Sequence, residues 1–252
     1  MLSLPETIDV VAAALALNRS IVAPAEVVRH GPLWILRDSM RKAGKTRTEE
    51  LFAYGAVPAE VVRALRDYAP SGKYALEPFV SPDEDIAEAK AQYKALGFRL
   101  ARSEPLFVCP LANPEPAVSR WHIRRVESLE EARAVCLQIF GKASRKVRPE
   151  DLETPTPAIR MYWVEVDGAV VAVARSLMPQ PSATWMHDVE TRPEFRRRGI
   201  ATALLGHVLA DDARHGSAYS VLLATQAGSK LYPQVGYHQR ALLQIYSPAP
   251  AK

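Results

Sequence analysis

Apolar residues recur at helical spacing in some segments of the chain and alternate with polar residues in others, so both helices and strands are expected. The pattern predicts helices over 8–17, 58–68, 82–96, 129–140 and 199–213, with a short one over 229–234. It predicts strands over 33–36, 50–54, 74–80, 98–108, 122–126, 161–166, 169–177, 184–191, 220–225 and 237–246.

Local signals place the ends of several elements. Ser81-Pro82-Asp83-Glu84 has the residues of a capping box, and Gly97 stops the helix that follows. Asp167-Gly168 between two apolar runs is typical of a type I′ hairpin turn. The hexapeptide Pro-Ala-Glu-Val-Val-Arg occurs at 24–29 and at 58–63, and we interpret both copies as helix starts rather than as a structural repeat.

Prolines divide the chain into two regions. Three of them lie between Cys109 and Pro116, where they remove hydrogen-bond donors and stiffen the backbone. We therefore expect an N-terminal α/β region at 1–110, a linker at 111–118 and a C-terminal domain at 119–248. In the C-terminal domain the predicted order is β-α-β-β-β-α-β-α-β, an α/β (α+β) fold.

Composition narrows the functional classes. The 252 residues carry a net charge of +4 without a dense lysine tract, which favours a small anionic ligand over nucleic acid. Cys109 and Cys136 form no metal-ligand pattern, and we expect no metal. Met1 to Ile8 lacks the layout of a signal peptide, and no apolar run reaches the ~20 residues of a membrane span. A cytoplasmic monomer or homodimer that avoids membranes is expected.

The segment Arg196-Arg197-Arg198-Gly199-Ile200-Ala201 is the strongest chemical signal. It opens a predicted helix, whose first N–H groups have no partner within the helix and attract anions. Gly199 lets a ligand approach the backbone without a side chain in the way. This turn predicts a site for a pyrophosphate-like group, with added charge from the arginines.

The order of elements, the Arg-x-x-Gly-x-Ala turn at 196–201 and the later Leu231-Tyr232-Pro233-Gln234-Val235-Gly236-Tyr237 resemble the GNAT superfamily of acyl-CoA-dependent N-acetyltransferases over roughly 119–248. The resemblance implies a mixed, mostly antiparallel central sheet flanked by helices. It also implies acetyl-CoA as donor and a primary amine as acceptor.

The resemblance assigns residues to the donor. The pyrophosphate is expected on the backbone of the turn, and the pantetheine arm along the strand before it. The implied acetyl-CoA contacts are Val189, Glu190, Thr191, Arg196, Arg197, Arg198, Gly199, Ile200, Ala201, Thr202, Thr225, Ser229 and Tyr232. Ser229 has the alternative of capping the predicted short helix.

Tyr232 is the implied proton donor to the leaving thiolate, and its alternative is a half-buried core aromatic. The attacking amine must lose a proton, for which His187, Asp188 and Glu190 are the candidate bases, with water as the alternative. Strand alternation predicts that Asp188 and Glu190 share one face and that His187 points to the other.

Several features depart from the family pattern or leave alternatives open. Thr225-Gln226-Ala227 stands where relatives often have an asparagine, and Pro233 follows the tyrosine. A non-catalytic acyl-CoA-binding module with the same fold is the second hypothesis. Residues 89–111 resemble the closing part of a GNAT-like unit, so the N-terminal region is either a degenerate half-domain or an unrelated cap. The basic run 141–148 hints at an acidic acceptor, against the alternative of a solvated loop.

Overall fold

The computed structural model describes residues 2–39, 47–111, 119–144, 146–226 and 228–250. The chain forms two compact units. The C-terminal unit comprises 108–222 and 230–238, and the N-terminal unit comprises 2–107, 223–229 and the residues from 239 onward. Apart from Leu111, the expected linker at 111–118 lies outside the described residues. Among the described residues, no helix is both long enough and apolar enough to cross a bilayer.

The sheet of the C-terminal unit has the strand order β10-β9-β8-β7-β6. Neighbouring strands run antiparallel except β9 and β10, which are parallel. Its strands are β6 (Ile123–Arg125), β7 (Ile159–Val166), β8 (Ala169–Gln180), β9 (Ala183–Thr191) and β10 (Tyr219–Leu223). Its helices are α4 (Leu129–Phe140), α5 (Pro149–Glu153), α6 (Ile200–Arg214) and the 3₁₀ helices η1 (Pro193–Phe195) and η2 (Tyr232–Val235).

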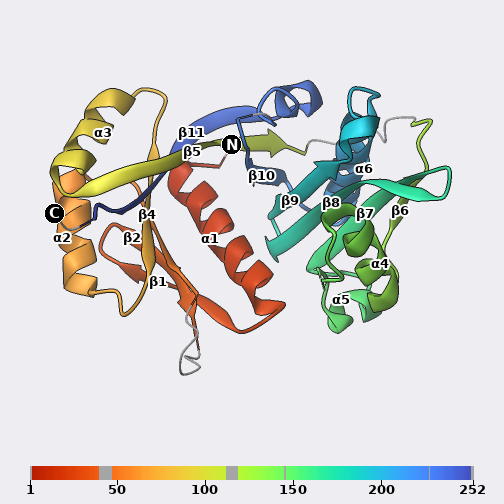
Figure 1. The fold of residues 1–252 in the computed structure, drawn as a ribbon, viewed down its shortest axis with the longest axis horizontal. Coiled ribbons are helices and arrows are strands. Elements are labelled where there is room, and N and C mark those ends of the chain that lie inside the picture. The colour runs from red at the N-terminus through yellow and green to blue at the C-terminus, as the bar shows by residue number, and fades with distance from the viewer. Residues whose placement is uncertain (1, 40–46, 112–118, 145, 227, 251–252) are drawn as a thin grey trace. The chain divides into compact units, whose positions relative to one another are not determined.

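Helices cover the β7–β9 sheet on two sides (Figure 1). Helix α4 packs on β8, and α6 packs on β7, β8 and β9. The β7–β8 hairpin turns at Asp167 and Gly168, with φ of 51° and 77°, which confirms the expected type of turn. The buried Val221 and Leu222 confirm that β10 is a buried strand.

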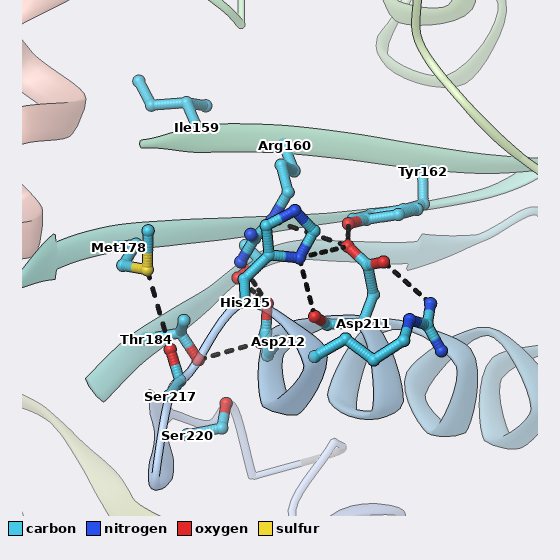
Figure 2. Close-up of polar contacts among 12 residues, drawn as sticks. Ile159, Arg160, Tyr162, Met178, Thr184, Asp211, Asp212, His215, Ser217 and Ser220 are labelled. Atoms are coloured by element: carbon cyan, nitrogen blue, oxygen red, sulfur yellow. Dashed lines mark hydrogen bonds and ion pairs between the residues drawn. The ribbon is translucent and has the colours of Figure 1, made fainter. Parts of the chain in front are cut away.

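A buried ion pair attaches α6 to the sheet (Figure 2). Arg160 on β7 donates from Nη2 to Oδ1 of Asp212 on α6 at 2.5 Å. The same carboxylate accepts from Ser176 on β8 at 2.7 Å and from Thr184 on β9 at 2.8 Å. One turn of α6 is therefore bonded to three successive strands, which holds the helix in place from its C-terminal end.

The N-terminal unit is built on the strand order β1-β2-β3-β4-β11. Its strands are β1 (Ala25–His30), β2 (Leu33–Asp38), β3 (Glu49–Ala53), β4 (Tyr74–Val80) and most of β5 (Phe98–Pro110) and β11 (His238–Pro248). Helix α1 (Leu4–Ser20) packs on β1 and β2. Helices α2 (Pro58–Tyr68) and α3 (Ile86–Ala95) share a core with Leu33, Ile35 and Leu51. Figure 1 shows α1 apart from α2 and α3, on the other side of these strands.

The two units share one order of elements. In each, an antiparallel hairpin leads to a third strand, then to a helix, then to a strand parallel to the third. In the N-terminal unit this is β1-β2-β3-α2-β4, and in the C-terminal unit it is β7-β8-β9-α6-β10. The N-terminal region is therefore a second βββαβ unit rather than an unrelated cap of helices and sheet.

Most predicted elements are confirmed, three expectations are wrong and one helix was missed. The hexapeptide at 58–63 begins α2, but its copy at 24–29 lies largely in β1, which pairs with β2 along its whole length. The third helix starts at Ile86 with Asp85 as its N-cap, because Asp85 accepts from two N–H groups, whereas Ser81 and Glu84 close only a turn. The 229–234 segment begins its helical turn at Tyr232, with Leu231 rather than Ser229 as the cap. Helix α5 was not predicted.

Candidate functional site

The turn between β9 and α6 is held in an unusual backbone conformation. Gly199 caps α6 with φ of 77°, and Arg197 adopts φ of 63°, a region that non-glycine residues seldom enter. The first backbone N–H of this helix that bonds back is that of Ala203, which donates to the carbonyl of Gly199 at 3.0 Å. Within the described part of the chain, the amides before it in the first turn have no backbone acceptor and are left for an external one, as an anion-binding site requires.

Two arginines of the turn form hydrogen bonds with neighbouring residues of the chain. Arg196 donates to the carbonyl of Thr191 and to Glu190, both at 2.9 Å. Arg198 donates to the carbonyl of Glu194 at 2.9 Å, and its guanidinium lies 5.0 Å from the Phe195 ring centre. Their side chains thus shape the turn, so the backbone amides are the better candidates for holding a phosphate.

The side chains that follow the turn divide between core and surface. Ile200 is buried against the sheet, whereas Ala201 and Thr202 are partly exposed. All three residues lie in the first turn of α6, and their contacts with a donor stay a prediction.

Strand β9 has an open edge beside the turn. Its parallel pairing with β10 covers only Ala183–Trp185, aligned with Tyr219–Val221. From Met186 to Thr191, no pairing with β10 is recorded within the described residues. Backbone groups on such an edge can bond an extended ligand. Val189, Glu190 and Thr191, the residues expected to hold the pantetheine arm, lie on this stretch.

A β-bulge distorts the same stretch of β9. Val173 pairs with Glu190 and Arg175 with His187, so β9 has one residue more than β8 between these pairs. Asp188 takes up the difference with φ of 48°. The expectation that His187 and Asp188 point to opposite faces is wrong, because the bulge interrupts the alternation and brings Nδ1 of His187 within 3.0 Å of Oδ1 of Asp188.

Asp188 is surrounded by cations. Oδ2 accepts from Nε of the buried Arg175 at 2.9 Å, and Nζ of Lys146 lies 3.0 Å from it. Burial alone raises the pKa of a carboxyl group, but the hydrogen bond with His187 and the charges of Arg175 and Lys146 outweigh it. The pKa of Asp188 is therefore held well below its usual range.

Tyr232 lies on η2, which packs against α6. Its side chain is buried, and its ring meets that of Tyr237 edge-on at 5.7 Å. Burial and the negative charge of Glu190 raise the pKa of Tyr232 to about 12. Glu190 lies on the open edge of β9, so the charge of that edge acts on the Tyr232 hydroxyl of η2.

Thr225 and Ser229 belong to the N-terminal unit. The Thr225 hydroxyl accepts from the amide of Gly228 at 3.1 Å, and the Ser229 hydroxyl donates to the carbonyl of Gln226 at 2.8 Å. Both side chains thus stabilise their own loop, and their contact with a donor stays a prediction.

Sequence reasoning missed Lys146 and Arg175, which share Asp188. A signal was available for Arg175, because it is the one charged residue in the apolar run from Ala169 to Met178. A charge in such a run is expected to be buried with a partner. Lys146 gave no comparable signal, since its partner lies far away in sequence.

Comparison with known proteins agrees with this geometry. Residues 126–237 match the model of the acetyltransferase (GNAT) family. No curated protein matches the chain. Its fold is similar to a GCN5-related N-acetyltransferase from Kribbella flavida, with a TM-score of 0.66 and 18% identity over 96% of each chain.

Two further structures extend this likeness. One is a GCN5-related N-acetyltransferase from Sphaerobacter thermophilus, at TM-score 0.57 and 17% identity, covering 86% of this chain and 78% of that one. The other is a tandem GNAT protein from the clavulanic acid biosynthesis pathway, at TM-score 0.51 and 13% identity, covering 99% and 97%. Residues 126–237 of this chain therefore form an acetyltransferase domain of the GNAT family, and a GNAT-like fold extends over the whole chain.

Proposed function

We propose that the C-terminal unit transfers the acetyl group of acetyl-CoA to a primary amine. The observation that carries the proposal is the left-handed turn at Arg197 and Gly199, directly between an open strand edge and the N-terminus of α6. The amides of the first turn of α6 would hold the pyrophosphate. The free edge of Val189–Thr191 would hold the amide-bearing pantetheine arm.

In this proposal the amine nitrogen attacks the thioester carbonyl, and the carbon–sulfur bond breaks to release the thiolate of CoA. Tyr232 would donate its proton to that thiolate. With a pKa of about 12 its hydroxyl is protonated at neutral pH, so it is available as a donor.

The proton lost by the amine needs an acceptor. Asp188 is poorly suited, because Arg175 and Lys146 stabilise its ionised form and lower its basicity. His187 is tied to the same cluster. Glu190 is the most accessible candidate of the three, although Arg196 partly neutralises it. We therefore favour Glu190, acting directly or through water.

A first experiment measures thermal unfolding with increasing acetyl-CoA. A ligand that binds only the folded state stabilises it by mass action, by about 2.7 kcal/mol at a hundredfold excess over Kd. We expect Tm to rise with acetyl-CoA, and ATP at matched concentrations is the control for nonspecific anion binding. An unchanged Tm at saturating acetyl-CoA contradicts the proposal.

Asp188 and Glu190 pair with cations and His187 is held against Asp188, which favours a second function, an acyl-CoA-binding module without turnover. A thiol-release assay over a panel of amines separates the two. Release that depends on both acetyl-CoA and an amine supports the enzyme, whereas tight acetyl-CoA binding without release supports the module.

A further inference from the structure

We propose that the acceptor amine also carries an anionic group, a carboxylate or a phosphate, which binds beside Lys146 and His187. The inference rests on the proposed acetyl transfer and specifies its substrate class. Its basis is the side-chain cluster at the bulge of β9, in which positive charge exceeds negative charge and one buried donor has no partner among the residues that the structure describes.

The cluster lies on the face of the sheet opposite α6. The pairs Arg175–His187 and Leu177–Trp185 place those four side chains on one face, because directly opposed residues point the same way. Ser176 and Thr184 point to the other face, where they bond Asp212 of α6. The cluster adjoins Glu190 along the chain, so it lies where an acceptor would approach the donor strand.

The charges in the cluster do not balance. Arg175 and Lys146 both pair with the single carboxylate of Asp188, at 2.9 and 3.0 Å. One positive charge is therefore left over even when His187 is neutral. Arg175 is fully buried, whereas the Lys146 and His187 side chains are 28% and 26% exposed, so these two are the groups that a ligand can reach.

Asp188 cannot serve as the anchor of a cationic acceptor. Its carboxylate already contacts Arg175, Lys146 and His187. A substrate ammonium would have to displace one of these three groups. An acceptor whose anion meets Lys146 instead adds a charge-assisted contact without breaking an existing one.

The same face holds an unused donor. Nε1 of Trp185 is buried and has no hydrogen-bond partner among the described residues. Its ring centre lies 6.5 Å from that of His187. Buried indole N–H groups usually find an acceptor, so this one points to an oxygen supplied from outside the chain.

The loop between α4 and α5 is fixed to this face. Nη1 of Arg175 donates to the backbone carbonyl of Lys146 at 2.7 Å, and Nζ of Lys146 lies 5.3 Å from the Phe140 ring centre. Both the backbone carbonyl and the ammonium group of Lys146 are thus fixed by contacts, and we assign it the role of a specificity-determining residue.

The test compares matched acceptors in the thiol-release assay with saturating acetyl-CoA. One series sets amino acids against their amides, and the other sets an amino sugar phosphate against the free amino sugar. We expect kcat/KM to favour the acidic member of at least one series by about tenfold or more. The series that shows the preference identifies the anion.

Variants assign the preference to Lys146. Lys146→Met should reduce the acid-to-neutral ratio about tenfold through KM, and Lys146→Arg should restore most of it. Lys142→Met removes the same charge from an exposed position of the same loop and should leave the ratio unchanged.

The outcomes separate this inference from the proposed function. Turnover that favours the neutral acceptors, or a ratio unaffected by Lys146→Met, overturns the anionic acceptor but leaves acetyl transfer standing. An absence of turnover with every acceptor overturns both.

Discussion

Arg160 and Asp212 form an ion pair of 2.5 Å between β7 and α6, and their side chains are 1% and 0% exposed. Breaking such a pair by removing one partner costs about 3–5 kcal/mol, and Arg160 would keep only its longer contact with Asp211, at 3.8 Å from Nε. We expect Asp212→Asn to lower the free energy of unfolding by this amount.

Denaturant titration measures that loss. Glu165→Gln removes a carboxylate from an exposed position on the same strand as Arg160, and it should change stability by less than about 0.5 kcal/mol. Equal effects of the two substitutions would mean that the buried pair is not what anchors α6.

Replacing Gly199 should weaken acetyl-CoA binding. An added Cβ meets no atom within 4 Å, so the cost to the fold is that of φ 77° in a residue with a side chain, about 1–2 kcal/mol. Gly168→Ala is a matched control, since Gly168 has the same φ and equally open space but lies in the β7–β8 turn.

We expect both alanine variants to lose a similar amount of folding stability. Only Gly199→Ala should raise the Kd for acetyl-CoA, by about tenfold or more, because the ligand approaches the backbone at this position. Titration calorimetry of the two variants provides the comparison. Undiminished affinity in Gly199→Ala would exclude close approach of the donor at this position.

Tyr232→Phe tests the proton donor. It removes only the hydroxyl, and general acid catalysis contributes about 10²–10⁴-fold. We expect kcat to fall by at least tenfold while the Kd for acetyl-CoA stays nearly constant. Tyr219→Phe, at the opposite end of the parallel β9–β10 pair, should leave kcat unchanged. Full turnover in Tyr232→Phe would remove this residue from the mechanism.

Glu190 and Asp188 should respond differently to loss of charge. Glu190→Gln should lower kcat, because it removes the favoured base. Asp188→Asn should instead lower stability, because the carboxylate offsets the buried Arg175. Steady-state kinetics and thermal unfolding of both variants provide the comparison, with the exposed Glu194→Gln as control. An undiminished kcat in Glu190→Gln would favour water as the base.

Glu77 on β4 makes the N-terminal unit sensitive to pH. Burial and the charge of Glu50 raise the pKa of Glu77 to about 8, from 4.5. Between these values the unfolded chain loses the proton that the folded chain keeps, so folding stability contributed by this group falls as pH rises from 4.5 to about 8.

Glu77→Gln removes that dependence. We expect the variant to gain stability relative to the native chain between about pH 5 and about pH 9, as measured by urea unfolding. Glu60→Gln, exposed on α2, should show no such trend. A constant difference between Glu77→Gln and the native chain across this range would contradict the raised pKa.

The sequence alone was sufficient for features encoded by neighbouring residues. The Asp167-Gly168 turn and the limits of α2 and α4 depend on local backbone preferences, and the structure has them where they were expected. The family resemblance over the C-terminal half rested on the order of elements and on two local segments, 196–201 and 231–237, and it is confirmed over 126–237.

Tertiary structure decided what local preferences leave open. Pro-Ala-Glu-Val-Val-Arg is a strand after Pro24 because β2 supplies backbone partners, and a helix after Pro58 because its apolar face packs on the sheet. The bulge at Asp188, its pairing with Arg175 and Lys146, and the anchoring of α6 by Arg160 all join residues distant in sequence. Such contacts depend on the register and pairing of strands, which the spacing of residues along the chain does not specify.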